Sequence, residues 1–172
     1  VIVLTSCKAA PTPTPTPLPP TPTPAPYPVT VTDMSGRSVQ ISSRPARIVT
    51  IHPTATEMLY RIGGVAIGRD TSSKFTPEIK PLTTVGGAYN PSIEAVIALQ
   101  PDLIVMEALT QGRLLDAAQK AGAPVIMVRA ASLDDVAQSL AILGKALDRQ
   151  QAAAQATTEI RTRVQASTAT MT

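Results

Sequence analysis

The polar side chains best suited to chemistry stand at the ends of short apolar runs. His52 is the only histidine in the 172 residues and directly follows the apolar run at 48–51. An imidazole can act as a general base, ligate a metal or hydrogen-bond a carboxylate. Asp70 and Glu107 are carboxylates in the same setting after later apolar runs. These three residues are the first candidates for acid–base or ligand-binding chemistry.

No catalytic motif accompanies them. The sequence has no G-x-S-x-G elbow, no G-x-G-x-x-G fingerprint and no Walker loop. A surface-tethered α/β hydrolase-like enzyme, with His52 paired to Asp70 or Glu107, remains the alternative interpretation. The lack of a recognisable nucleophile or metal cluster disfavours it, so we expect no catalytic residues, no bound metal and no cofactor.

The elements that must position these residues begin with a strand–loop–helix unit. The β-branched run at 48–51 predicts a buried strand, which Pro53 ends. Thr54 and Glu57 stand at capping-box spacing, and the glycine pair at 63–64 predicts the end of the helix.

The same rhythm continues along the chain. Further strands are expected over 65–68, 82–85, 103–106 and 124–128. One helix is expected to begin with Asn90 as its cap and Pro91 in its first turn. Two more are expected over 110–121 and, behind the cap Ser132, over 133–147. Alternating valines and isoleucines over 29–42 predict a β-hairpin ahead of them. The fold class is therefore α/β, with a parallel sheet and an N-terminal hairpin.

In open parallel sheets, ligands bind beyond the carboxyl ends of the strands. The residues expected there are His52, Pro53 and Thr54; Asp70, Thr71 and Ser72; Ala88, Tyr89 and Asn90; Met106 and Glu107; and Arg129. This set mixes donors, acceptors and one aromatic ring, which suits a large polar ligand.

Each of the prominent members also has an ordinary structural interpretation. His52 is equally a loop histidine before a proline, and Tyr89 a half-buried loop tyrosine. Arg129 either pairs with anionic ligand groups or is a solvated strand-end arginine. The polar run that begins at Asp70 is equally a turn with local side-chain bonding.

Composition limits the possible partners. Residues from 29 onward suffice for one ordinary domain, and the hydrophobic fraction of 44% is typical of globular proteins. Aromatic residues make up only 2%, and the basic residues behind the net charge of +3 are scattered, so nucleic acid is an unexpected partner. No apolar run is long enough to cross a membrane.

The N-terminal region predicts an anchor and a spacer. Residues 1–6 look like the remnant of a signal peptide, and the tetrad ending at Cys7 resembles a bacterial lipobox whose cysteine is acylated. Ten of the seventeen prolines fall within 11–28, which predicts a polyproline II stalk. A leader of no consequence, or a purely structural stalked lipoprotein, remains an alternative.

The C-terminal region, 148–172, is alanine-rich with one apolar stripe. We expect a long helix that needs something further to pack on, so the sequence is expected to stop before the protein does. The domain plan is then a signal remnant at 1–6, an anchor and linker at 7–28, a lobe at 29–147 and an inter-lobe helix at 148–172.

Three stretches carry a family resemblance: DMSGRSVQI at 33–41, RPARIVTIHPTATEMLYRIGG at 44–64 and VGGAYNPSIEAVIALQPDLIV at 85–105. They resemble the N-terminal lobe of the iron-chelate and cobalamin class of ABC-transporter substrate-binding lipoproteins. The resemblance implies two lobes joined by a long helix, with a ferric siderophore, haem or cobalamin held between them. The second lobe is missing here, so weak binding by this chain alone is expected.

The resemblance also implies partners and residue roles. A lipid-anchored, extracytoplasmic monomer would deliver its ligand to an ABC permease in the membrane. Glu94 matches the glutamate that pairs with permease arginines, although a surface glutamate near a helix N-terminus needs no such role. Tyr89 could stack on a macrocycle or ligate haem iron. Haem-binding relatives place their tyrosine slightly earlier, so contact is expected rather than ligation.

Overall fold

The computed structural model describes residues 27–75 and 77–169. A five-stranded sheet lies at its centre, in the order β5 (Thr83–Thr84), β4 (Ala66–Arg69), β3 (Ile48–Thr50), β8 (Leu103–Glu107) and β9 (Val125–Val128). Every neighbouring pair is parallel. The prediction of a parallel α/β sheet is confirmed.

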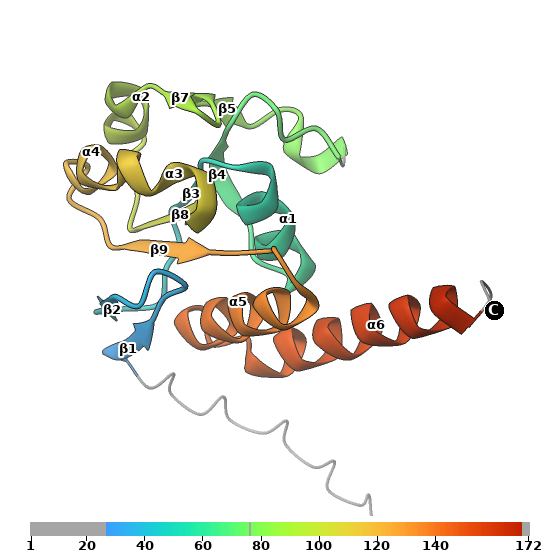
Figure 1. Ribbon diagram of the computed structural model, residues 1–172. Coiled ribbons are helices and arrows are strands. Elements are labelled where there is room, and N and C mark those ends of the chain that lie inside the picture. Colours follow the sequence, from blue (N-terminus) through green and yellow to red (C-terminus); the bar gives the residue numbers. More distant parts are fainter. Residues whose placement is uncertain (1–26, 76, 170–172) are drawn as a thin grey trace, which may run out of the picture.

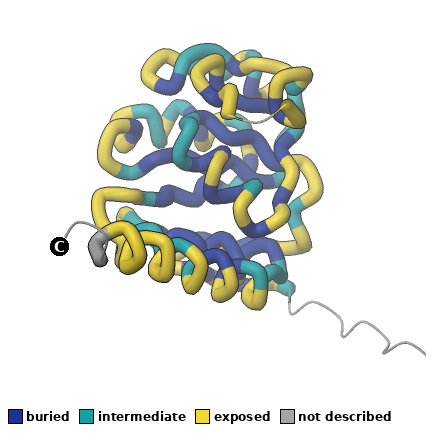
Figure 2. Tube along the Cα trace, turned by 90° about the vertical axis from the view of Figure 1, so that its right-hand side faces the viewer, coloured by how far each residue is buried: buried dark blue, intermediate teal, exposed yellow. Residues whose placement is uncertain are grey.

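Alternating strand residues feed two cores, one on each face of the sheet. Ile48, Leu103 and Val105 pack with helices α1 (Pro53–Arg61), α5 (Leu133–Ala146) and α6 (Gln150–Ala169). Ile104 and Met106 point the other way, toward α2 (Ile93–Ala98) and α4 (Leu115–Gln119). Strands covered on both faces must be apolar throughout, as these are. The layers are visible in Figure 1, and the buried strands form the dark interior of Figure 2.

The hairpin predicted over 29–42 is present as β1 (Val29–Thr32) and β2 (Ser38–Ile41), paired antiparallel. Its inward residues join the core beside α5. Its turn also covers the open edge of β9. The Met34 amide donates to Met127 O at 3.0 Å, and the Met127 amide donates to Asp33 Oδ2 at 3.2 Å. An otherwise unpaired strand edge is thereby protected.

The helices differ from the predictions in three places. Asn90 does not cap a helix, because it pairs through β7 (Asn90–Pro91) with β6 (Gly86–Gly87), and Ser92 caps α2 instead. The single helix expected over 110–121 is broken into α3 (Ala108–Gln111), η2 (Gly112–Leu114) and α4. A further short helix, η1 (Pro77–Ile79), lies in the connection from β4 to β5. Ser132 caps α5 as predicted.

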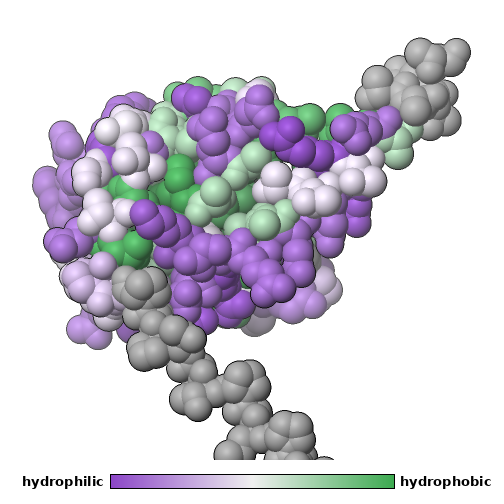
Figure 3. All heavy atoms as spheres, turned by 90° about the horizontal axis from the view of Figure 1, so that it is seen from below, coloured by the Kyte–Doolittle hydropathy of each residue, from purple (hydrophilic) through white to green (hydrophobic). Residues whose placement is uncertain are grey.

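Helix α6 begins two residues after the sharp turn at Asp148, whose φ is +55°. Its first half packs on α5 through Ala153 and Ala156, which are buried, whereas residues 161–167 are exposed. The helix continues beyond the rest of the lobe (Figure 1). Seen from below, hydrophobic residues gather toward the middle of the surface and hydrophilic ones surround them (Figure 3).

Candidate functional site

The segments that follow the five parallel strands all leave the sheet at one edge, which we call the carboxyl rim. When the five strands are numbered by their order in the chain, they lie side by side in the order 3-2-1-4-5. The chain therefore proceeds toward one side of the sheet from β3 and toward the other side from β8. Ligand crevices in doubly wound sheets form at this kind of switch point. The prediction that the βα turns emerge along one rim is confirmed. His52 and Glu107 stand on the two sides of the switch point.

His52 is the N-cap of α1, with extended backbone at φ −144° and ψ 145°. Its Nδ1 accepts the Thr54 amide at 3.2 Å, and Pro53 takes the first helical position. The capping box predicted from Thr54 and Glu57 is therefore wrong, because the imidazole already occupies the capping position. Glu57 lies exposed on the helix instead.

The protonation state of His52 follows from its surroundings. Burial lowers its pKa below the ordinary value of 6.5, and the nearby charges of Glu107 and Asp70 oppose this shift less strongly. The ring is therefore neutral at pH 7. Since Nδ1 is an acceptor, the proton is on Nε2. Metal ligation through Nε2 would push the proton to Nδ1, against the Thr54 amide, so the geometry favours a hydrogen-bond donor over an iron ligand.

Asp70 is completely buried and bonded internally. Its Oδ1 accepts the amides of Ser72 at 2.7 Å and Ser73 at 3.1 Å, and Oδ2 accepts the Ser73 hydroxyl. That hydroxyl lies 3.0 Å from the Thr56 hydroxyl on α1. The carboxylate holds the loop against α1, while Thr71 and Ser72 are exposed.

Tyr89 projects from the β6–β7 hairpin. Its side chain is 58% exposed, and its ring meets that of His52 edge-to-face with centroids 6.1 Å apart. Asn90 is exposed beside it, whereas Ala88 is buried. Gly86 permits the tight hairpin, because φ is +93° and a Cβ would come within 2.9 Å of Asn90 O. An aromatic ring is thus presented at the carboxyl rim.

Glu107 acts as the N-cap of α3. Its carboxylate accepts the amides of Leu109 at 3.0 Å and Thr110 at 2.9 Å, and the Thr110 hydroxyl at 2.7 Å. Both carboxylate oxygens are engaged in capping α3, which is a structural use of the residue and not the acid–base role of the enzyme alternative. Met106 is completely buried in the core below α2 and α4.

Arg129 follows β9 and is tied to α5. Its Nη2 lies 2.6 Å from Asp135 Oδ1, and Ser139 Oγ bonds both the amide and the carbonyl of Arg129 at 2.9 Å. The hydrogen bond to Arg129 lowers the pKa of Asp135 below its ordinary value. The guanidinium is therefore already paired inside the lobe.

One residue that joins these loops escaped the sequence analysis. Gln111 is completely buried and bonds to the segments before His52, before Tyr89 and at Glu107. A glutamine inside an expected helix carries no signal of this role, because its partners are distant in sequence.

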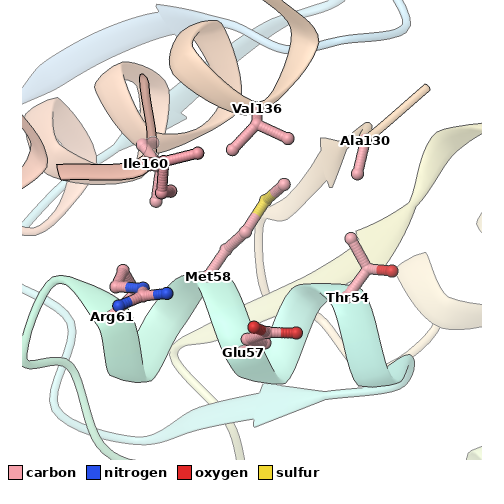
Figure 4. Close-up of a pocket in the computed structure, with 8 residues that line it drawn as sticks. Thr54, Glu57, Met58, Arg61, Ala130, Val136 and Ile160 are labelled. Carbon is pink, nitrogen blue, oxygen red and sulfur yellow. The ribbon is translucent and has the colours of Figure 1, made fainter. Parts of the chain in front are cut away.

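A cavity of about 280 Å³ lies beside the carboxyl rim, between α1, α5 and α6. Its lining includes the buried Met58 and Leu140 and the exposed Glu57 and Arg61. Figure 4 shows Met58 extending from α1 toward Val136 on α5. Thr54 is the only predicted ligand-binding residue among those that line it. The cavity and the His52–Tyr89 surface are therefore neighbouring but different features.

Glu94 lies in the first turn of α2 and is exposed. Backbone hydrogen bonding and the Ser92 hydroxyl, 3.1 Å from Oε2, lower its pKa. Cys7 and the linker lie outside the described residues. Within residues 27–75 and 77–169, no helix is long and apolar enough to cross a membrane. The same part of the chain has no group of three or more His, Cys, Asp or Glu residues placed to hold a metal.

Comparison with known proteins defines the class. Residues 48–171 match the model of the family described as periplasmic binding protein. The chain is 30% identical over 139 residues to the "Cobalamin-binding protein" of Halobacterium salinarum, covering 78% of this chain and 38% of that protein. It is 31% identical over 122 residues to the ABC transporter substrate-binding lipoprotein YvrC of Bacillus subtilis, covering 67% and 38%.

Among solved structures, a periplasmic heme-binding protein from Pseudomonas aeruginosa superposes with a TM-score of 0.63 and 28% identity, covering 70% of this chain and 45% of that one. The chain belongs to the periplasmic binding protein family, whose members are the binding proteins of transport systems. It spans about 38% of the length of each of the two curated relatives.

Proposed function

We propose that this protein is the extracytoplasmic solute-binding component of an ABC importer. It captures a metal chelate at the carboxyl rim and delivers it to a permease, without performing chemistry on it. The observation that carries this proposal is the gathering of all five βα segments at one rim, around the His52–Tyr89 pair, in a member of a transport-binding family.

The charges of the carboxyl rim favour one class of chelate. Asp70 and Glu107 are used by backbone amides, Arg129 is paired with Asp135, and His52 is neutral at pH 7. Of the predicted ligand-binding residues, those that remain for a ligand are neutral: the Nε2–H of His52, the Tyr89 ring, and the exposed polar groups of Thr71, Ser72 and Asn90. The exposed guanidinium of Arg113, which donates to Tyr89 O, adds a positive charge beside them.

Such a surface suits a corrinoid better than a polyanionic ferric siderophore. A corrinoid carries many carboxamides and an apolar ring, which match neutral donors and an aromatic ring. A ferric carboxylate or catecholate complex carries several negative charges and would demand more cations than Arg113 supplies. The Halobacterium relative named as cobalamin-binding supports the same choice. Haem is the runner-up, since Tyr89 offers a ring face and a phenol.

For the permease, we propose docking through Glu94. The carboxylate is exposed on a surface helix, and its lowered pKa keeps it ionised over a wide pH range. An ionised, accessible carboxylate suits arginines on a membrane partner. Cys7 is the proposed lipid attachment site, in keeping with the lipoprotein designation of the Bacillus relative.

Equilibrium dialysis of the full-length protein against cyanocobalamin, haem and a ferric siderophore tests the ligand, because this chain alone is expected to bind weakly. We expect retention of cyanocobalamin, weakened by Tyr89→Ala and His52→Ala. Gln40→Ala, at an exposed position of β2 outside the carboxyl rim, should leave it unchanged. Retention of none of the three compounds would refute the transport-binding proposal. Hydrolysis of a chromogenic ester that depends on His52 would favour the enzyme alternative instead.

A further inference from the structure

We propose that Gln111 is a positioning residue for the carboxyl rim, which sets the place of His52 relative to Tyr89. Its side-chain amide makes three hydrogen bonds to three separate segments. Nε2 donates to Ile51 O at 3.0 Å and to Ala88 O, and Oε1 accepts the Glu107 amide at 2.8 Å.

The placement of these bonds matters more than their number. Ile51 directly precedes His52, and Ala88 directly precedes Tyr89. A single NH₂ group therefore holds the carbonyls of the two residues that directly precede the ring-bearing residues. The third bond fixes this amide to the end of β8, across the switch point.

The side-chain amide of Gln111 is fixed in this arrangement by its burial and its hydrogen bonds. Gln111 is 0% exposed, and both of its N–H groups are used. Loss of either bond would leave a buried carbonyl without its partner, which is unfavourable. The bridge is thus a firm link between segments that lie 60 and 23 residues away from Gln111 in sequence.

Arg113 reinforces one side of the bridge. Its Nη2 donates to Tyr89 O at 3.2 Å, so two consecutive carbonyls, at Ala88 and Tyr89, are held from the segment that spans α3 and η2. The bond of Arg113 is exposed, whereas that of Gln111 is buried. Gln111 is therefore expected to dominate.

The functional consequence is preorganisation. Tyr89 is more than half exposed, yet its ring stays against His52 because its backbone is anchored from below. A ligand that meets an ordered ring pair does not have to order it, and its affinity is higher for that reason. This last step rests on the proposed function, whereas the positioning itself does not.

The single histidine makes the test direct. At pH 8, where His52 is neutral, its two carbon-bound ring protons give isolated ¹H resonances shifted by the Tyr89 ring. Tyr89→Leu supplies the reference without that ring. We expect Gln111→Leu to move the His52 resonances most of the way toward this reference, and Gln111→Glu, which keeps an acceptor for the Glu107 amide but loses the NH₂ group, to do likewise.

The control is Tyr27→Phe, which removes the 2.8 Å bond from the Tyr27 hydroxyl to Ala146 O outside the carboxyl rim. It should leave the His52 resonances in place despite a similar loss of one hydrogen bond. If Gln111→Leu does not fold, Gln111→Glu and the hydrogen-exchange protection of the wild-type Glu107 amide still decide the matter. Wild-type His52 resonances in a folded Gln111 variant, or an unprotected Glu107 amide, would overturn the proposal.

Dialysis against cyanocobalamin then separates the two proposals. We expect Gln111→Glu to bind about 3- to 10-fold more weakly than wild type. Shifted His52 resonances with no cyanocobalamin binding by the wild type would refute the proposed ligand and leave the positioning role intact. Unchanged resonances with normal binding would refute the positioning role alone.

Discussion

The imidazole of His52 and the phenol ring of Tyr89 meet edge-to-face, with centroids 6.1 Å apart and planes inclined by 76°. One ring caps a helix that follows β3, and the other projects from a hairpin that follows β5. Aromatic pairs prefer this arrangement over face-to-face stacking. The pair lies at the carboxyl rim, and the partial burial of His52 there gives this residue a shifted pKa that can be measured.

The first prediction concerns the titration of His52. Burial lowers its pKa below 6.5, so NMR should find its midpoint below that value. Glu107→Gln removes the largest opposing charge and should lower the midpoint further. A midpoint that stays fixed in Glu107→Gln would contradict this electrostatic account.

The same shift links folding to pH. Between the folded and unfolded pKa values of His52, the unfolded chain binds more protons than the folded one. The contribution of His52 to the free energy of unfolding is therefore fully present above pH 6.5 and is lost as the pH falls toward the folded pKa. Urea denaturation at a series of pH values should show this slope, and His52→Gln should flatten it.

The second prediction concerns the Asp33 turn. Its carboxylate accepts the amides of Ser35 and Arg37 at 3.0 Å, lies 2.5 Å from the Arg37 guanidinium and receives the Met127 amide. Asp33→Ala leaves the Arg37 guanidinium without its carboxylate partner and removes the hydrogen bond to the Met127 amide at the edge of β9. We expect a loss of about 2–4 kcal/mol in urea denaturation.

Size-exclusion chromatography should also show a greater tendency of Asp33→Ala to associate, because the strand edge is exposed. Gln40→Ala, in the same hairpin but exposed, is the control. Equal stability of the Asp33 variant and the control would show that the turn does not hold β9.

The third prediction concerns the contact of α5 with α6. Alanine normally stabilises a helix relative to glycine. At Gly144, however, an added Cβ would lie 2.7 Å from the Ala153 Cβ. We expect Gly144→Ala to lower the free energy of unfolding by about 1–3 kcal/mol.

The matched control is Gly112→Ala, where nothing lies within 4 Å of the added carbon and φ is −52°. It should be neutral or stabilising by up to about 1 kcal/mol. Thermal denaturation of both variants is the measurement, and a stabilised Gly144→Ala would mean that α5 and α6 are not packed this closely.

The fourth prediction separates the two possible caps of α2. Ser92 Oγ accepts the Ala95 amide at 3.1 Å. Ser92→Ala should therefore cost about 1 kcal/mol in chemical denaturation. Asn90→Ala should change stability by less than about 0.5 kcal/mol, because Asn90 takes part in β7 through its backbone. The reverse order would restore Asn90 as the cap.

The capping errors show where sequence reasoning stops. Thr54 and Glu57 have the right spacing for a capping box, and Asn90-Pro91 the right order for a helix start. Both patterns are local, and in each case another interaction takes the place of the predicted one. His52 caps the N-terminus of α1, and Asn90 pairs with Gly87 in the β6–β7 hairpin.

The break after Gln111 has a similar origin. Apolar periodicity favours a continuous helix over 110–121, but the structure divides it at Gly112. The side chain just before the break is turned to carbonyls on two other segments. Its partners lie far along the chain, so the sequence gives no local sign of the bridge.

The amino-acid sequence by itself determined the order of strands and helices, the parallel sheet and the shared rim, because apolar period, glycine and proline act over a few residues. Only the tertiary structure decided which polar side chains are used in internal bonds and which are exposed at the carboxyl rim. Asp70, Glu107 and Arg129 are committed to internal bonds, whereas Tyr89 stays exposed. That division depends on partners supplied by the folded chain, such as the Thr56 hydroxyl near Asp70 or the Gln111 amide below Tyr89, and local sequence does not encode such contacts.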